Sequence, residues 1–378
     1  MLKKKIGIVG GGQLGRMLIN ESIRYDLEIS VLDPDINAPC KSIAHTFHCG
    51  SLQDFDTVYS FGKKCDIVTI EIENINVDAL EKLTSEGIQV FPQPHIIRMI
   101  QDKGLQKEFY LANDIPTAEF KLIKNHVELH QNETYLPFVQ KLRVGGYDGK
   151  GVEVMKTRTD FVKGFDAPSV LEKFVDFKKE ISVIVARNSA GDIKTYPVVE
   201  LEFNPVANLV EFLFSPADIS DAAETQAQKI AVEIIEKLQL TGVLAVEMFL
   251  THNDQVLVNE IAPRPHNSGH QTIEANITSQ YEQHLRAILN LPLGATDSVM
   301  PAVMVNILGE KNHSGQAVYE GLGEILQIPG VYLHLYGKKT TKPFRKMGHV
   351  TVLDLDLEKA KEKAHIVKQT IRAISNGA

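Results

Sequence analysis

The sequence is poor in several features that mark common classes of protein. Its three cysteines, Cys40, Cys49 and Cys65, lack the paired spacing of a metal site and favour reduced, structural thiols in a cytoplasmic protein. No apolar run approaches the about 18 residues that a membrane-spanning helix needs, so we expect no membrane partner. Basic residues (40 Lys and Arg) are outnumbered by acidic residues (48 Asp and Glu), and the formal net charge of −8 disfavours nucleic acid as a partner.

Short apolar runs and helical periodicity alternate through about the first hundred residues. The pattern predicts buried strands at Ile6–Val9, Ile29–Leu32, Ile67–Ile70 and Ile88–Phe91, and an amphipathic helix over Gln13–Tyr25. Strands that alternate with helices are typical of a parallel α/β sheet.

The pattern becomes mixed beyond this region. Helices are predicted around 96–113 and over 222–238, with short strands before, between and after them. Leu291–Gly294 is predicted to be a linker. The remaining segment predicts strands at 302–308, 331–335 and 348–353, then a lysine-rich helix over 357–374.

A glycine-rich turn follows the first predicted strand. Gly10–Gly15 matches G-x-G-x-x-G between a strand and a helix, and Asp33 ends the next strand. This is the dinucleotide fingerprint, and the segment alone is equally compatible with NAD and with another anion at a helix N-terminus. The rest of the chain weakens the NAD interpretation.

A second glycine-rich segment lies at 140–151. Lys141 ends an apolar run, and four glycines follow around Tyr147, Asp148 and Lys150. Glycines let backbone N–H groups approach a ligand closely, and lysine supplies a point charge for phosphate. The segment therefore predicts a loop that closes over a polyphosphate.

Two glutamates follow apolar runs further along the chain. Either Glu247 or Glu260 alone would be interpreted as a solvated carboxylate at a strand end. Together with Asn259, and after a phosphate-type loop, they favour Mg²⁺ ligands that bridge to nucleotide phosphates.

The segment Arg264–His270 packs hydrogen-bond donors between a proline and a glycine. A polar surface loop is the alternative, but the position directly after the predicted metal strand favours anion binding. Glu71 and Glu73 close another strand, where open α/β sheets bind ligands, and we favour Glu73 as the ligand contact.

Five basic residues form a cluster near the C-terminus. A solvated basic face and a phosphate-holding role are comparable interpretations of this set: Lys338, Lys339, Lys342, Arg345 and Lys346.

In its order of motifs the chain resembles the ATP-grasp superfamily, and within it the N5-carboxyaminoimidazole ribonucleotide synthetases of purine biosynthesis. Four segments carry the resemblance and span nearly the whole chain: 11–17 (GGQLGRM), 145–151 (GGYDGKG), 259–270 (NEIAPRPHNSGH) and 345–349 (RKMGH). Lys150 stands where the family commonly has arginine.

The resemblance implies α/β and α+β architecture in three parts. These are a Rossmann-like pre-ATP-grasp domain (1–100), an ATP-grasp domain (101–294, with a lid at about 114–172) and a small β-rich C-terminal domain (295–378). It implies that ATP phosphorylates bicarbonate to carboxyphosphate, which carboxylates 5-aminoimidazole ribonucleotide. It also implies a homodimer, and a hand-off of product to the downstream mutase is a further hypothesis.

Site residues follow from the resemblance by matching position. It implies ATP contacts at Lys103, Lys141, Gly146, Gly149, Glu172, Lys173, Val175, Glu180 and Asn259. It implies Mg²⁺, with Mn²⁺ as a substitute, at Glu247 and Glu260. It implies catalytic roles for Tyr147, Asp148, Lys150, Arg264, His266 and Asn267. It implies substrate contacts at Gly12, Gln13, Leu14, Glu73, Ser268, Lys339, Arg345 and Lys346.

Two alternatives remain open at this point. One is another ATP-grasp ligase that joins a carboxylate to an amine. The other, from a different class, is an NAD-binding dehydrogenase built on the N-terminal fingerprint.

Overall fold

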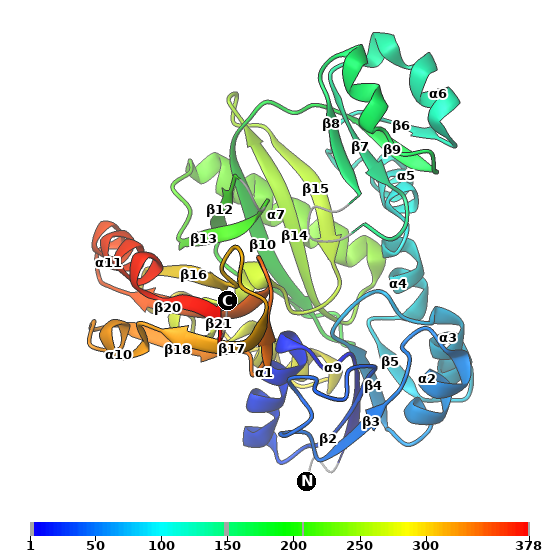
Figure 1. Ribbon diagram of the computed structural model, residues 1–378. Coiled ribbons are helices and arrows are strands. Elements are labelled where there is room, and N and C mark those ends of the chain that lie inside the picture. Colours follow the sequence, from blue (N-terminus) through cyan, green and yellow to red (C-terminus); the bar gives the residue numbers. More distant parts are fainter. Residues whose placement is uncertain (1–3, 147–150, 206–207, 377–378) are drawn as a thin grey trace.

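The computed structural model describes residues 4–146, 151–205 and 208–376, and it confirms the predicted fold class. A parallel α/β sheet is followed by a small antiparallel sheet and a large, mostly antiparallel sheet (Figure 1). Within the described ranges, no helix is long and apolar enough to cross a membrane.

The N-terminal sheet has five parallel strands in the order β3-β2-β1-β4-β5. The strands are β1 (Lys5–Val9), β2 (Glu28–Asp33), β3 (Thr46–Cys49), β4 (Ile67–Ile70) and β5 (Gln89–Phe91). Its central strands are apolar on both faces because helices cover both. One face packs against α1 (Gln13–Ser22) and the distant α9 (Gln280–Ile288), the other against α2 (Phe55–Gly62) and α3 (Val77–Ser85) (Figure 1).

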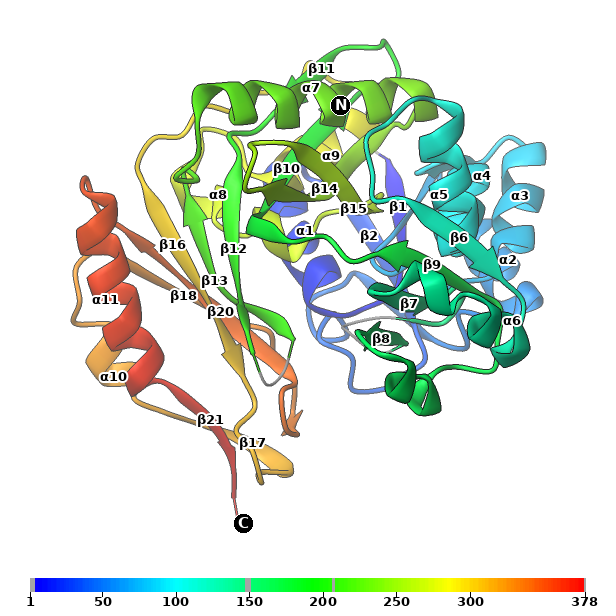
Figure 2. The same ribbon diagram turned by 90° about the horizontal axis from the view of Figure 1, so that it is seen from above.

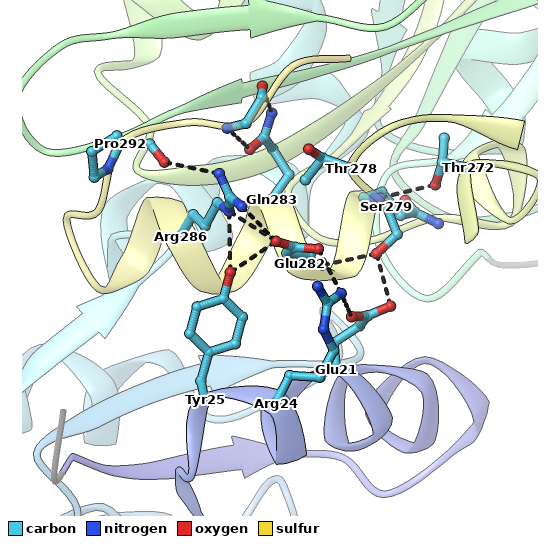
Figure 3. A network of polar contacts seen from close by, with 12 residues as sticks. Glu21, Arg24, Tyr25, Thr272, Thr278, Ser279, Glu282, Gln283, Arg286 and Pro292 are labelled. Atoms are coloured by element: carbon cyan, nitrogen blue, oxygen red, sulfur yellow. Dashed lines mark hydrogen bonds and ion pairs between the residues drawn. The ribbon is translucent and has the colours of Figure 1, made fainter. Parts of the chain in front are cut away.

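A polar network fixes the N-terminal sheet to α9. The buried carboxylate of Glu282 accepts hydrogen bonds from the Tyr25 hydroxyl (2.8 Å) and pairs with Arg24 (2.9 Å) and Arg286 (2.6 Å) (Figure 3). Tyr25 lies in the short 3₁₀ helix η1 (Ile23–Tyr25), which continues α1. The turn before α1 is therefore held at a set position relative to the rest of the molecule.

Two helices connect this sheet to a smaller unit: α4 (Pro94–Ile100) and α5 (Lys103–Ala112). The small sheet has the antiparallel order β6-β9-β7-β8. Its elements are β6 (Phe120–Ile123), α6 (His126–Gln131), η2 (Glu133–Tyr135), β7 (Phe138–Leu142), β8 (Val152–Met155), η3 (Arg158–Lys163) and β9 (Ser169–Lys173).

The large sheet has nine strands in the order β15-β14-β10-β12-β13-β16-β20-β18, with β11 paired to β10. The strands before residue 300 are β10 (Phe177–Arg187), β11 (Ile193–Thr195), β12 (Val199–Asn204), β13 (Leu209–Ser215), β14 (Gly242–Thr251) and β15 (Val256–Ala262). The amphipathic α7 (Asp221–Leu238) buries its apolar face on β10 and β14 (Figure 2).

The C-terminal strands continue this same sheet through the pairing of β13 with β16. They are β16 (Ala302–Leu308), β18 (Val331–Leu335) and β20 (Lys346–Leu353). A separate three-stranded sheet, β19-β17-β21, lies beside them. Its strands and the nearby helices are β17 (Gly315–Glu320), α10 (Leu322–Ile325), β19 (Thr340–Thr341), α11 (Leu357–Thr370) and β21 (Arg372–Ser375).

The prediction of one helix over 357–374 was wrong at its end. The helix stops at Thr370, and residues 372–375 pair with β17 as an antiparallel strand. Ala373 is fully buried in the C-terminal core, so packing against β17 outweighs the helical pattern of the preceding residues.

Candidate active site

The two predicted metal carboxylates lie directly opposite each other on adjacent strands. Glu247 of β14 is the register partner of Glu260 of β15, so both side chains project from the same face of the sheet. The Lys103 ammonium at the start of α5 pairs with Glu260 at 2.7 Å. Glu247 lies 3.6 Å from the His266 ring.

The electrostatics of this pair fit a divalent cation. Burial raises the pKa of Glu247, and the carboxylates of Glu260 and Glu180 raise it further, whereas the Lys103 ammonium lowers the pKa of Glu260. A cation between the carboxylates would relieve their repulsion. No cluster of three or more His, Cys, Asp or Glu suited to a metal occurs among the described residues, so the remaining ligands would be phosphates and water, as Mg²⁺ prefers.

Lys141 belongs to a closed ring of polar contacts between the two sheets. It donates to the Asn259 side chain at 2.8 Å and pairs with Glu172 at 3.0 Å. The second oxygen of Glu172 pairs with Lys107 at 3.1 Å. Lys107 donates to Thr117 (2.6 Å), whose hydroxyl donates to the carbonyl of Val258, the residue before Asn259 (2.7 Å).

A small pocket lies against this ring. Eight side chains line it: Lys103, Gln106, Lys107, Tyr110, Lys141, Glu172, Asn259 and Glu260. Lys103, Asn259 and Glu260, which are predicted to bind ATP or Mg²⁺, thus line the same cavity as Lys141 and Glu172. The polar contacts around this cavity join the small sheet to the large sheet at the predicted ATP site.

Several of the predicted ATP contacts lie where β9 passes into β10. Burial raises the pKa of Glu180 on β10 to about 7. The Lys173 side chain turns toward the carbonyls of Tyr135 and Leu136 (3.0 and 3.3 Å), which leaves only its backbone for a nucleotide. Val175 follows β9 in the connection to β10 and is half-buried.

The glycine-rich loop of the small sheet is anchored at its base. The Leu142 amide donates to the Gly151 carbonyl (2.9 Å), and Gly146 is the last described residue before 147–150. Arg143 pairs with Asp102, the residue that caps α5. Tyr147, Asp148, Gly149 and Lys150 lie outside the described residues.

The segment after β15 carries Arg264, His266 and Ser268 toward the face of the large sheet that bears Glu247 and Glu260. Arg264 forms an ion pair with Glu73 at 2.8 Å. The His266 ring contacts the Ser268 hydroxyl at 2.9 Å, which in turn lies 2.8 Å from the Ser182 hydroxyl of β10.

The Asn267 side chain points toward β16 rather than toward the other predicted catalytic residues. Its amide forms two reciprocal hydrogen bonds with Asn306 of β16, at 3.0 and 2.9 Å, and it is 9% exposed. Both ends of its side-chain amide are engaged there, so a direct catalytic contact by Asn267 would require this pair to open.

Two carboxylates occupy the glycine-rich turn at the start of α1. Glu71 accepts hydrogen bonds from the amides of Gly12 (2.6 Å) and Leu14 (3.3 Å), on either side of Gln13, and Asp33 accepts one from Gly11 (2.7 Å). A substrate phosphate bound through the predicted amides would have to displace Glu71. The same occupancy removes the amides that a dinucleotide pyrophosphate would use.

The predicted C-terminal basic residues make separate contacts. Lys339 donates to Asn37 in the loop after β2 (3.0 Å), and Arg345 donates to the Thr340 carbonyl (2.7 Å). The positive charge of Lys346 acts to lower the pKa of Glu247, in opposition to burial.

Several residues of this site were missed by the sequence interpretation. Lys107 follows Lys103 by four residues on α5, and this helical spacing could have indicated it. Ser182 and Asn306 carry no sequence signal, because only strand register places them beside Ser268 and Asn267.

Three family matches divide the chain. Residues 3–101 match the ribonucleotide synthetase preATP-grasp domain, residues 108–281 the ATP-grasp domain, and residues 302–363 the phosphoribosylaminoimidazole carboxylase C-terminal domain. Fold and carboxylate–lysine site together define an ATP-dependent ligase of the ATP-grasp class.

The similar proteins narrow the class. The N5-carboxyaminoimidazole ribonucleotide synthase of Bacillus subtilis is 37% identical over 92% of this chain and 91% of that protein. A crystal structure of the synthetase from Thermotoga maritima matches with a TM-score of 0.91 and 44% identity, over 99% of this chain and 100% of that one. The chain belongs to the N5-carboxyaminoimidazole ribonucleotide synthase family.

Two further similarities bear on function. The enzyme of Aspergillus clavatus in complex with ADP and 5-aminoimidazole ribonucleotide matches with a TM-score of 0.89 and 34% identity, over 97% of this chain and 98% of that one. The chloroplastic phosphoribosylaminoimidazole carboxylase of Vigna aconitifolia is 39% identical over 93% of this chain. This chain spans 64% of that longer protein.

Proposed function

We propose that the protein carboxylates 5-aminoimidazole ribonucleotide with ATP and bicarbonate, releasing N5-carboxyaminoimidazole ribonucleotide, ADP and phosphate. The observation that carries this proposal is the pair Glu247 and Glu260, placed between Lys103 on one side and the Arg264–Ser268 segment on the other. The fungal relative that holds ADP and the aminoimidazole nucleotide shares this fold over nearly its whole length.

The proposed reaction has two steps, phosphoryl transfer and then carboxyl transfer. Bicarbonate oxygen attacks the γ-phosphorus, ADP leaves, and the amine then attacks the carboxyl carbon of carboxyphosphate as phosphate leaves. Lys103 and Lys141 supply positive charge to the phosphates, and Arg264 with His266 orients the bicarbonate. Bound Mg²⁺ would neutralise charge on the transferring phosphoryl group. Asp148, in the loop outside the described residues, is proposed to act near the reacting amine.

The finer expectations also remain proposals. They are the three-part division at residues 100 and 294, the individual site residues, a homodimer, a hand-off to the mutase and a cytoplasmic location. Light scattering on a sizing column tests the dimer, because a monomer at micromolar concentration would contradict it.

The first test measures ADP release with Mg-ATP while bicarbonate and the aminoimidazole nucleotide are added separately and together. Strong stimulation that requires both substrates supports the reaction. Folded protein that binds ATP but responds to neither would instead support another ATP-grasp ligase.

Replacing Glu260 tests the metal assignment. Glu260→Ala is expected to reduce Mg-dependent ADP release to background, because one of two opposed carboxylates is lost. Glu200→Ala is the matched control, since Glu200 pairs with Lys179 on the same sheet and should leave turnover intact. A folded Glu260→Ala protein with substantial Mg-dependent turnover would contradict the assignment.

A further inference from the structure

Two of the sequence motifs end in the same dipeptide, Gly-His, and their histidines stack on each other. The rings of His270 and His349 lie 4.6 Å apart at 30°. Both preceding glycines permit close approach. A Cβ on Gly348 would lie 2.6 Å from the carbonyl oxygen of His334, and one on Gly269 would lie about 2.5 Å from the Gln280 side chain.

His349 is the middle of a polar row across three neighbouring strands. Asn306 of β16 and His334 of β18 are both direct register partners of His349 on β20. Directly opposite residues of antiparallel strands project from the same face. The strands are spaced at about 4.8 Å, so the row has that repeat.

A segment with a similar repeat lies against this row. Asn267, His270 and Glu274 follow one another at intervals of three and four residues through η4 (Asn267–Gly269) and α8 (Thr272–Ala275). With a rise of about 2 Å per residue in the 3₁₀ turn and about 1.5 Å in the α-helix, successive members are about 5–6 Å apart. The two repeats match, so each member of one row can meet one member of the other.

Each pair is in contact, and we call the three contacts the seam. Its outer rungs are hydrogen-bonded and its centre is the histidine stack: Asn267 with Asn306 (3.0 and 2.9 Å), His270 with His349, and Glu274 with His334 (2.6 Å). The His334 ring also stacks on His349, at 4.4 Å and 11°.

The central rings are held rigidly. His270 and His349 are buried, and burial lowers the pKa of both well below the usual value, so both are neutral and free of mutual repulsion. The Tyr281 and Tyr336 hydroxyls each lie 3.0 Å from Nδ1 of one of these rings. A neutral, hydrogen-bonded stack fixes both position and orientation.

The seam joins the two halves of the substrate side of the site. One row continues directly from Arg264–Ser268, and the middle member of the other row, His349, lies on β20, the strand that begins at Lys346. We propose that His270 and His349 are positioning residues, which hold the Arg264–Ser268 segment in register with the basic C-terminal strands that bind the aminoimidazole nucleotide. This inference rests on the proposed function.

The test compares KM values for the aminoimidazole nucleotide and for ATP in His349→Ala. Because the seam lies between the substrate segments and away from Lys141, we expect the KM for the aminoimidazole nucleotide to rise about tenfold and that for ATP less than about twofold. His349→Phe keeps a stacking ring and should stay within about threefold of wild type. In the double variant His270→Ala with His349→Ala, the loss should be smaller than the sum of the two single losses, because each single variant already removes the shared stack between the two rings.

His284→Ala is the matched control. His284 is equally buried and bonded, to Thr69 and the Val243 amide, but lies outside the seam. Equal rises in both KM values, a similar selective rise in His284→Ala, or additive losses in the double variant would overturn the inference.

Failure of the inference can be separated from failure of the proposed function. Wild-type protein that shows no stimulation by the aminoimidazole nucleotide overturns the function, whereas stimulated wild type with an unchanged His349→Ala overturns only the seam. Should His349→Ala not fold, His334→Ala carries the same test, because the His334 side chain is 24% exposed and its loss should be tolerated. Loss of the contact between His334 and Glu274 predicts a rise of about threefold in the KM for the aminoimidazole nucleotide alone.

Discussion

At the scale of single residues, the site is governed by how each buried charge is matched. Glu172 is 3% exposed and divides its two oxygens between Lys107 and Lys141. Burial lowers the pKa of Lys107 to about 8, although Glu172 acts in the opposite direction. The Glu172 carboxylate thus pairs both with Lys141, which is predicted to contact ATP, and with the buried Lys107.

Removing Lys107 should disturb both stability and nucleotide binding. In Lys107→Met, Glu172 retains Lys141 as its single cation, so we expect a loss of about 3 kcal/mol in the free energy of unfolding. Lys141 would be drawn toward Glu172, and the KM for ATP should rise about tenfold. Denaturant unfolding and steady-state ADP release measure the two effects.

The double variant Lys107→Met with Glu172→Gln supplies the control for this pair. It also replaces the carboxylate that has lost one of its two cations, so it should be more stable than Lys107→Met alone. Strictly additive losses would show that the two side chains are not coupled.

At the scale of elements, α5 links the predicted nucleotide residues to the small sheet. Asp102 caps the helix by accepting from the amides of Gly104 (2.7 Å) and Leu105 (3.3 Å). The same carboxylate binds the Arg143 guanidinium through two contacts, at 2.8 and 2.7 Å. The cap therefore also fixes the strand end from which the glycine-rich loop departs.

Asp102→Ala should lower the free energy of unfolding by about 1–2 kcal/mol through the lost cap and ion pair. It should also raise the KM for ATP at least about threefold, because Arg143 is released beside the loop. Asp54→Ala removes a comparable cap from α2, far from the site, and should lower stability without changing that KM. Equal KM changes in both variants would argue against a specific role for Asp102.

The same elements show how far sequence reasoning reached. The predicted strands at Ile67–Ile70, 302–308 and 331–335 agree with β4, β16 and β18 at both ends, because local β-propensity and turn residues mark them. β21 was missed, because its pairing with β17 joins segments more than fifty residues apart.

The residues of the candidate site also differ in whether the sequence could predict them. Motif residues such as Lys141 and Glu260 could be proposed from spacing and resemblance. The contact of Glu71 with the turn before α1 and the Asn267–Asn306 pair could not be predicted, because they depend on which strands become neighbours. Sequence spacing predicts contacts along one element, whereas tertiary register determines contacts between elements.

At the scale of the whole molecule, His284 lies where the sheets meet. Its Nε2 lies 2.9 Å from the Thr69 hydroxyl of β4, and its Nδ1 accepts from the Val243 amide of β14. Burial lowers the pKa of His284 to about 4. This imidazole therefore joins the N-terminal sheet to the large sheet only in its neutral form.

The sign of the resulting pH dependence follows from proton binding. Between about pH 6.5 and pH 4 the unfolded chain protonates His284 while the folded protein does not, so this residue makes stability fall as the pH falls. His284→Gln should remove about 1.4 kcal/mol per pH unit of that slope. Denaturant unfolding at pH 5 and pH 7 measures it, and equal slopes in wild type and variant would contradict the assignment.

The continuous large sheet has a consequence for how the chain acquires its structure. β13 pairs on its outer side with β16, and β16 in turn with β20. Until residues 302–308 have been synthesised, β13 carries an open row of backbone hydrogen-bonding groups, and β16 keeps such a row until residues 346–353 follow. During translation the nascent chain therefore exposes a sheet edge able to pair with other chains, and β16 and then β20 close that edge as they are added.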